Sequence, residues 1–120
     1  MEPKRKLLIA EDDDGFARPL VEFFCKKGFD VVRVADGPSA MSRIREADLC
    51  LFDVILPGVT GLELLAYVRR NRPGVPVILM SGKFAQKEAG RIKTAVGADG
   101  FLCKPFAPEE LLGMIHDAFV

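Results

Sequence analysis

Short hydrophobic runs alternate along the chain with longer segments in which apolar residues recur every three or four positions. Apolar runs bounded by Gly, Pro or charge are typical of buried strands, and the longer spacing is typical of amphipathic helices. The pattern predicts strands at Lys6–Ala10, Asp30–Val34, Asp48–Asp53, Val75–Met80 and Gly100–Cys103. It predicts helices at Phe16–Lys27, Pro38–Ala47, Gly61–Asn71, Ala85–Val96 and from Pro108 onward.

Strands and helices that alternate in this way form a parallel sheet with helices on both faces. The five units therefore predict an α/β protein with a doubly wound parallel sheet and five helices. The strand Asp30–Val34 alternates apolar and polar residues, so we expect it at an edge of the sheet. A length of 120 residues is enough for one domain with its own core, and we expect residues 1–120 to form it.

The composition is ordinary for a globular protein, with 49% hydrophobic residues, 28% charged residues and a formal net charge of zero. A neutral chain has no broad attraction for nucleic acid or membranes, so neither is expected as a partner. The apolar run behind the basic N-terminus is too short for a signal peptide. We expect Cys25, Cys50 and Cys103 to be buried, reduced thiols of a cytoplasmic protein.

Charged and hydroxyl side chains follow four of the predicted strands. Glu11 and Asp12 follow the first strand, Asp53 closes the third, Ser81 follows the fourth and Lys104 follows the fifth. The carboxyl ends of parallel strands lie at one edge of the sheet, where ligands of open α/β sheets bind. We therefore expect these side chains to form one site.

The carboxylates of this predicted site suit a divalent cation. Glu11, Asp12 and Asp53 would repel one another unless a cation joined them, and hard oxygen ligands suit Mg²⁺, with Mn²⁺ as a substitute. Ile55 lies two residues beyond the end of the strand and could add its backbone carbonyl. A metal held there would neutralise charge on a phosphoryl group during transfer.

The other polar groups suit phosphoryl chemistry. Asp53 would be the nucleophile and would form an aspartyl phosphate. Lys104 would pair with one phosphoryl oxygen, and Ser81 Oγ would hydrogen-bond another.

In this order, the motifs resemble those of the receiver domain of two-component response regulators, of the single-domain kind similar to chemotaxis regulators. The resemblance covers essentially all 120 residues. It rests on Glu11-Asp12, on the loop from Asp53 to Pro57 with Gly61, on Ser81-Gly82 and on Lys104-Pro105, where the family usually has a cis peptide bond. It implies the flavodoxin-like strand order 2-1-3-4-5.

The resemblance also implies a phosphorylation-activated switch of a phosphorelay, not an enzyme. A histidine kinase or a histidine phosphotransfer protein would donate a phosphoryl group to Asp53 in a Mg²⁺-dependent reaction that the receiver itself catalyses. Ser81 and Phe101 would then move inward together and reshape the surface of the fourth helix, fifth strand and fifth helix. A downstream protein or an output domain would read this surface, and two phosphorylated copies could pair through it. Because the chain stops at Val120, the sequence leaves open a single-domain regulator or a receiver separated from its output domain.

Several positions depart from the family pattern. Phe101 stands where many members have Tyr, so the switch would be steric, and Glu11 replaces a more frequent Asp. Ile55 and Lys83 occupy the positions that tune access of water to the phosphoryl group. We expect the bulky Ile55 to shield the acyl phosphate and prolong its lifetime. Pro19 lies inside the first predicted helix and is expected to delay its start or kink it.

Other function classes compete with this interpretation. A phosphohydrolase similar to the haloacid dehalogenases would need a second acid two residues after Asp53, where the chain has Ile55. A flavin or nucleotide site would need a glycine-rich loop after the first strand, and that loop is acidic. A docking module that works without phosphorylation stays open.

The remaining charged residues are interpreted as structural or solvated. Asp13 and Asp14 are expected to be loop carboxylates or a helix N-cap. Arg69, Arg70 and Arg72 are expected to compensate the dipole at the end of their helix rather than form a binding patch.

Overall fold

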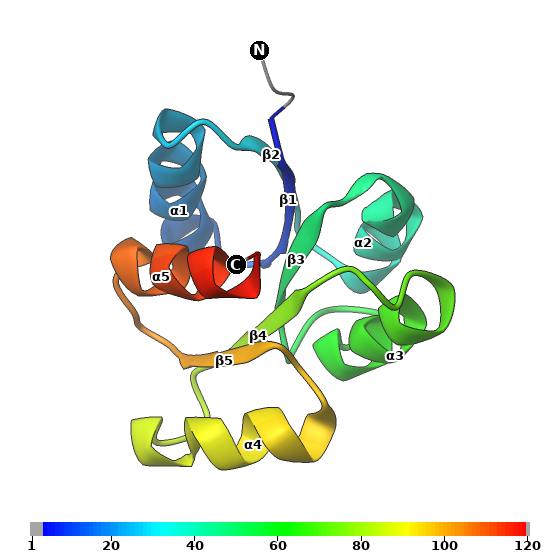
Figure 1. Ribbon diagram of the computed structural model, residues 1–120, viewed down its shortest axis with the longest axis vertical. Helices are drawn as coiled ribbons and strands as arrows, with labels where there is room; N and C mark the ends of the chain where they lie inside the picture. Colours follow the sequence, from blue (N-terminus) through cyan, green and yellow to red (C-terminus); the bar gives the residue numbers. More distant parts are fainter. Residues whose placement is uncertain (1–3, 120) are drawn as a thin grey trace.

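The computed structural model describes residues 4–119, so Val120 and the first three residues of the basic N-terminus lie outside it. Five parallel strands form one sheet in the order β2-β1-β3-β4-β5 (Figure 1). The strands are β1 (Lys6–Ala10), β2 (Asp30–Val34), β3 (Leu49–Asp53), β4 (Val77–Ser81) and β5 (Gly100–Cys103). The predicted doubly wound fold, its strand order and the edge position of β2 are confirmed.

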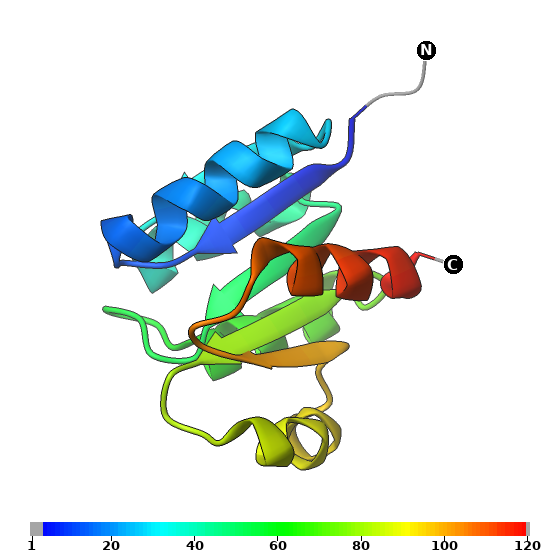
Figure 2. The same cartoon turned by 90° about the vertical axis from the view of Figure 1, so that its left-hand side faces the viewer.

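Helices cover both faces of the sheet. They are α1 (Asp14–Lys26), α2 (Gly37–Arg43), α3 (Gly61–Asn71), α4 (Ala89–Val96) and α5 (Pro108–Ala118), with short 3₁₀ turns at η1 (Ile44–Glu46) and η2 (Gln86–Glu88). Figure 2 shows α1 and α5 in front of the sheet, with α2 and α3 behind it. Within residues 4–119, no helix has the length and apolar character needed to cross a membrane.

Each strand contributes side chains to two hydrophobic cores, one on each face of the sheet, because successive side chains point to opposite faces. On β3, Leu49 and Leu51 pack in the core beneath α1 and α5. Cys50 and Phe52 pack in the core beneath α2, α3 and α4. All four side chains are fully buried, so the central strand is apolar throughout and ends in charge only at Asp53. The two cores hold the carboxyl end of this strand in place.

The first helix begins earlier than the apolar pattern predicts. Asp13 caps it, accepting hydrogen bonds from the N–H groups of Gly15 and Phe16, so the helix starts at Asp14. A delayed start, one of the two effects expected of Pro19, is therefore wrong, because α1 continues through this residue, and a kink at Pro19 stays a prediction. The helix ends where Gly28 adopts a positive φ of 94°.

Other predicted elements also differ at their ends, and β3 begins at Leu49 and not at Asp48. The helix predicted at Pro38–Ala47 is α2 followed by η1, and the helix predicted at Ala85–Val96 is η2 followed by α4. The fourth strand begins at Val77 and not at Val75, because Pro76 has no N–H to donate to the ladder. The carbonyl of Pro76 still accepts the N–H of Cys50 at 3.0 Å.

The cysteines are free thiols, but only two of them are buried. Burial raises the pKa of the Cys50 thiol to about 12, and Cys103 is also buried. Cys25 is exposed, so its predicted burial is wrong. It lies on the solvent side of α1, next to the fully buried Phe24.

Two of the three arginines at the end of α3 tie distant segments together. Arg72 Nη1 donates to the carbonyls of Ile44, Arg45 and Ala47 at 3.1, 2.9 and 2.8 Å. Arg69 donates to the carbonyls of Val75 and Gly97 and pairs with Asp99 at 2.7 Å. Arg69 and Arg72 therefore do more than compensate the helix dipole. Only the exposed Arg70 fits the expectation of a dipole-compensating surface charge.

We predict that Arg72→Met lowers the free energy of unfolding by about 1–3 kcal/mol, because partly buried carbonyls lose a charged donor. Urea unfolding followed by circular dichroism measures this change. Arg70→Met removes the same charge from the same helix and is expected to stay within about 0.5 kcal/mol of the wild type. Equal unfolding midpoints for the two variants would contradict the prediction.

Candidate functional site

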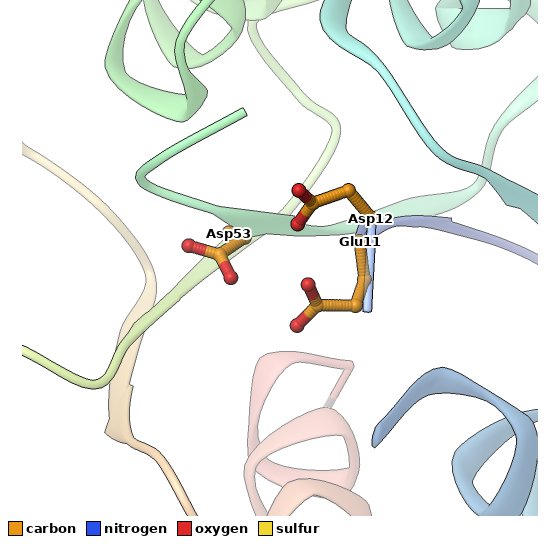
Figure 3. A group of neighbouring side chains, drawn as sticks. All are labelled: Glu11, Asp12 and Asp53. Carbon is orange, nitrogen blue, oxygen red and sulfur yellow. The ribbon is translucent and has the colours of Figure 1, made fainter. Parts of the chain in front are cut away.

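Three carboxylates meet at the carboxyl edge of the sheet. Because Ala10 of β1 pairs with Phe52 of β3, the residues that follow each of them lie side by side. Glu11, Asp12 and Asp53 each offer a carboxylate oxygen, and these oxygens lie within 4.8 Å of one another. Figure 3 shows the three carboxylates around a shared space. Glu11 is 0% exposed and Asp53 is 7% exposed, whereas Asp12 faces solvent.

Lys104 joins the two buried carboxylates. Its Nζ donates to Asp53 Oδ2 at 2.7 Å and also to Glu11 Oε1. Burial raises the pKa of the Glu11 carboxyl, and the hydrogen bond from Lys104 opposes that rise. Burial by itself would lower the pKa of Lys104, but its hydrogen bonds to Asp53 and Glu11 outweigh burial and leave that pKa raised. The ammonium therefore stays charged and offsets part of the negative charge of the cluster.

The second oxygen of each buried carboxylate is held by the backbone. Asp53 Oδ1 accepts the N–H of Ile55 at 2.9 Å, and Glu11 Oε2 accepts the N–H of Asp13 at 3.1 Å. No buried side-chain nitrogen or oxygen in residues 4–119 lacks a hydrogen-bond partner. Both carboxylates are thus fixed in orientation before any ligand arrives.

Ser81 is buried and ends β4 at the same edge of the sheet. Its Oγ accepts the N–H of Lys83 at 3.1 Å, and Ser81 pairs in register with Cys103. Phe101 lies deeper in β5 and is 2% exposed, with the ring of Phe84 edge-on to it at 5.9 Å. The structure therefore brings Glu11, Asp12, Asp53 and Lys104 together, places Ser81 beside them on the next strand and sets Phe101 apart.

The loop after Asp53 is held by two close backbone approaches. The N–H of Gly37 donates to the carbonyl of Pro57 at 2.9 Å, and the N–H of Gly61 donates to the carbonyl of Val54 at 3.0 Å. A Cβ at Gly61 would lie 2.2 Å from the carbonyl oxygen of Asp53. Only glycine fits at that point, so Gly61 allows α3 to start directly against the end of β3.

Sequence reasoning missed two features of the site. Arg33 of β2 donates from Nε and Nη2 to the carbonyl of Glu11, at 2.9 and 2.7 Å. Lys104 Nζ lies 4.6 Å from the centre of the Phe16 ring, which packs edge-on against Phe106. A signal for Arg33 was present in the sequence, because it is the charged residue next to the end of the edge strand β2, and the neighbouring strand β1 leads into the acidic loop.

The sequence profile of the family described as "Response regulator receiver domain" matches residues 7–116. The chain belongs to this family. It is therefore a receiver domain of two-component response regulators. The cis peptide bond between Lys104 and Pro105 agrees with what the motifs of this family imply.

Relatives support the same assignment. Sensory transduction protein RegX3 of Mycolicibacterium smegmatis is 34% identical over 112 residues, covering 92% of this chain and 48% of that protein. DNA-binding response regulator MtrA of Mycobacterium tuberculosis is 31% identical over 115 residues, covering 94% of this chain and 50% of that protein. The chain spans about half the length of these curated relatives. The structure of chemotaxis response regulator CheY4 of Vibrio cholerae matches with a TM-score of 0.83 and 28% identity, over 97% of this receiver and 99% of that chain.

We predict that Gly61→Ala destabilises the receiver by about 1–3 kcal/mol, because the new methyl group would overlap the backbone of Asp53. Gly90→Ala is the matched control, since Gly90 lies in α4 and a methyl group added there would meet no heavy atom within 4 Å. It should raise stability by about 0.5–1 kcal/mol through helix propensity. Urea unfolding of both variants is the measurement, and shifts of the same sign would refute the steric argument.

Proposed function

We propose that this receiver is a phosphorylation-activated switch whose phosphoacceptor is Asp53. The observation that carries the proposal is the contact of Lys104 with Asp53 and Glu11, within a cluster of three carboxylates at the carboxyl edge of the sheet. Residues 1–120 would act as one receiver domain in the cytoplasm. A histidine kinase or a histidine phosphotransfer protein would supply the phosphoryl group.

The transfer is a displacement at phosphorus. A carboxylate oxygen of Asp53 attacks the phosphorus of the donor phosphohistidine, the P–N bond breaks, and its electron pair returns to the donor imidazole. Asp53 is only 7% exposed, so the donor must present its phosphoryl group directly at the edge of the sheet. Slow loss of the phosphoryl group follows when water attacks the phosphorus and the carboxylate of Asp53 leaves with the electron pair of the P–O bond.

The donor set fits Mg²⁺, with Mn²⁺ as a substitute, because it consists of hard oxygen ligands that carry more negative charge than Lys104 offsets. Glu11, Asp12 and Asp53 would hold the ion, together with the backbone carbonyl of Ile55. When bound, the ion supplies charge neutralisation for the phosphoryl oxygens.

The remaining site residues would recognise the phosphoryl group and report its arrival. Lys104 would exchange a carboxylate partner for a phosphoryl oxygen, and Ser81 Oγ would donate a hydrogen bond to another. Movement of Ser81 with Phe101 would then alter the surface of α4, β5 and α5. A downstream protein or an output domain would read that surface, and phosphorylated copies could pair through it.

Incubation with acetyl phosphate and Mg²⁺ tests the proposal without a kinase. Intact mass spectrometry is expected to show the gain of one phosphoryl group, its loss when EDTA is present, and no gain in Asp53→Asn. Lys104→Met, once circular dichroism establishes that it is folded, should gain far less, because the ammonium no longer stabilises the transferring group. A wild-type protein that gains no mass under any of these conditions would favour a docking module that works without phosphorylation.

The lifetime of the phosphorylated state tests the role of Ile55. Ile55 is 51% exposed and its N–H donates to Asp53 Oδ1, so Ile55→Asn would remove apolar cover near Asp53 without opening a core cavity. We expect faster loss of the phosphoryl group in Ile55→Asn, because water reaches the acyl phosphate more easily. The mass shift is followed over time after acetyl phosphate is removed. Leu62→Asn, which changes a leucine that is 43% exposed on α3, is the control, and equal lifetimes in all three proteins would contradict the shielding role.

A further inference from the structure

We propose that Arg33 is a positioning residue for the cation site and acts through the main chain of Glu11. This inference rests on the proposed function, because it concerns the same carboxylates. Arg33 touches none of the reacting groups. It fixes the peptide unit that links the two metal-binding residues Glu11 and Asp12.

Each of the three nitrogens of the Arg33 guanidinium donates a hydrogen bond. Its Nε and Nη2 converge on the carbonyl oxygen of Glu11, at 2.9 and 2.7 Å, and its Nη1 pairs with Asp14 Oδ1. The Arg33 side chain is 21% exposed, whereas that of Asp14 is 63% exposed. The planar fork of a guanidinium sets a direction as well as a distance, which an ammonium cannot do.

Strand β2 therefore holds Glu11 from both sides of its α-carbon. The N–H of Glu11 donates to the carbonyl of Val34 at 3.0 Å, and its carbonyl accepts from Arg33. Glu11 lies one residue beyond the end of β1, where the regular strand has stopped. The contact with Arg33 replaces the support that a strand neighbour would give.

This contact controls the directions of both carboxylates. The peptide unit between Glu11 and Asp12 is planar, so a fixed Glu11 carbonyl also fixes the N–H and α-carbon of Asp12. The Glu11 side chain then points into the buried pair with Lys104, while Asp12 stays at the exposed rim. Without Arg33, rotation at this peptide unit would separate the two carboxylates and weaken cation binding.

Charge and positioning predict opposite effects of removing Arg33. A positive charge near a cation site weakens cation binding, so its loss would tighten binding if charge were its main contribution. Arg33 forms an ion pair with the Asp14 carboxylate, so the two side chains together carry little net charge. If Arg33 acts mainly by positioning the peptide unit between Glu11 and Asp12, its removal would instead weaken cation binding. The sign of the change therefore identifies the role.

The experiment measures Mn²⁺ affinity from the electron paramagnetic resonance signal of free Mn²⁺, with circular dichroism to establish that each variant is folded. We expect Arg33→Met to weaken Mn²⁺ binding about ten-fold, as loss of an outer-shell contact does in metal sites. Arg33→Lys keeps the charge but loses the fork, and should fall between Arg33→Met and the wild type. The Mg²⁺ affinities of the three proteins, measured by competition with Mn²⁺, should fall in the same order.

Arg18→Met is the matched control. Arg18 is 79% exposed and pairs with the same Asp14 at 3.8 Å, but it does not contact Glu11. This variant removes one positive charge from the same neighbourhood and is expected to bind Mn²⁺ as tightly as the wild type, or slightly more tightly. Weakening in Arg33→Met together with no weakening in Arg18→Met supports the positioning role.

Tighter or unchanged Mn²⁺ binding in a folded Arg33→Met would overturn it. If Arg33→Met does not fold, Arg33→Lys decides the question, and wild-type affinity in that variant would also overturn the role. A wild-type receiver that binds no Mn²⁺ would instead refute the proposed cation site, and the role of Arg33 with it. The two failures are therefore distinguished by the wild-type measurement.

Discussion

The Lys104 ammonium, shared by Glu11 and Asp53, is the interaction on which the carboxyl edge of this sheet depends. Two carboxylates with oxygens less than 4.8 Å apart repel each other by about 3–4 kcal/mol at an effective dielectric constant of about 20. Both are buried, so water cannot relieve that repulsion. The ammonium relieves it, and each remaining buried oxygen receives a backbone N–H. A charged cluster can therefore stand at the end of an apolar sheet.

The same contacts suit the cluster to the proposed chemistry. A site that must accept a cation and then a phosphoryl group needs negative charge, an oriented nucleophile and a movable positive charge. Asp53 is oriented by Ile55, and Lys104 spans two carboxylates, so it can release one of them for a phosphoryl oxygen. The hydrogen bonds that stabilise this edge of the sheet are therefore the ones that the proposed function would use. A change in the partners of Lys104 would affect the ends of β1 and β3, which carry Glu11 and Asp53.

The surrounding scaffold limits how far these groups can move. The cores on the two faces of the sheet hold β3, the close approach at Gly61 sets the start of α3, and Arg33 connects the edge strand to the acidic loop. The aromatic ring of Phe16 lies against Lys104 and covers part of the ammonium. The site is therefore assembled from every strand of the sheet, although its reacting groups come from only a few residues.

The alternation of strands and helices, the fold class and the residues at the strand ends follow from the amino-acid sequence, because hydrophobic periodicity and turn residues act over short distances along the chain. The sequence placed Glu11, Asp53 and Lys104 at one edge, since parallel strands align their carboxyl ends. The burial of Cys25 did not follow from the sequence, because it depends on how α1 is turned against the sheet. Which atoms pair at the site depends on contacts between residues that are distant in the sequence. Lys104 and Glu11 pair although 93 residues separate them in the sequence. The backbone carbonyl of Glu11 is free to accept from Arg33 only because the hydrogen-bond ladder of β1 ends one residue earlier, at Ala10.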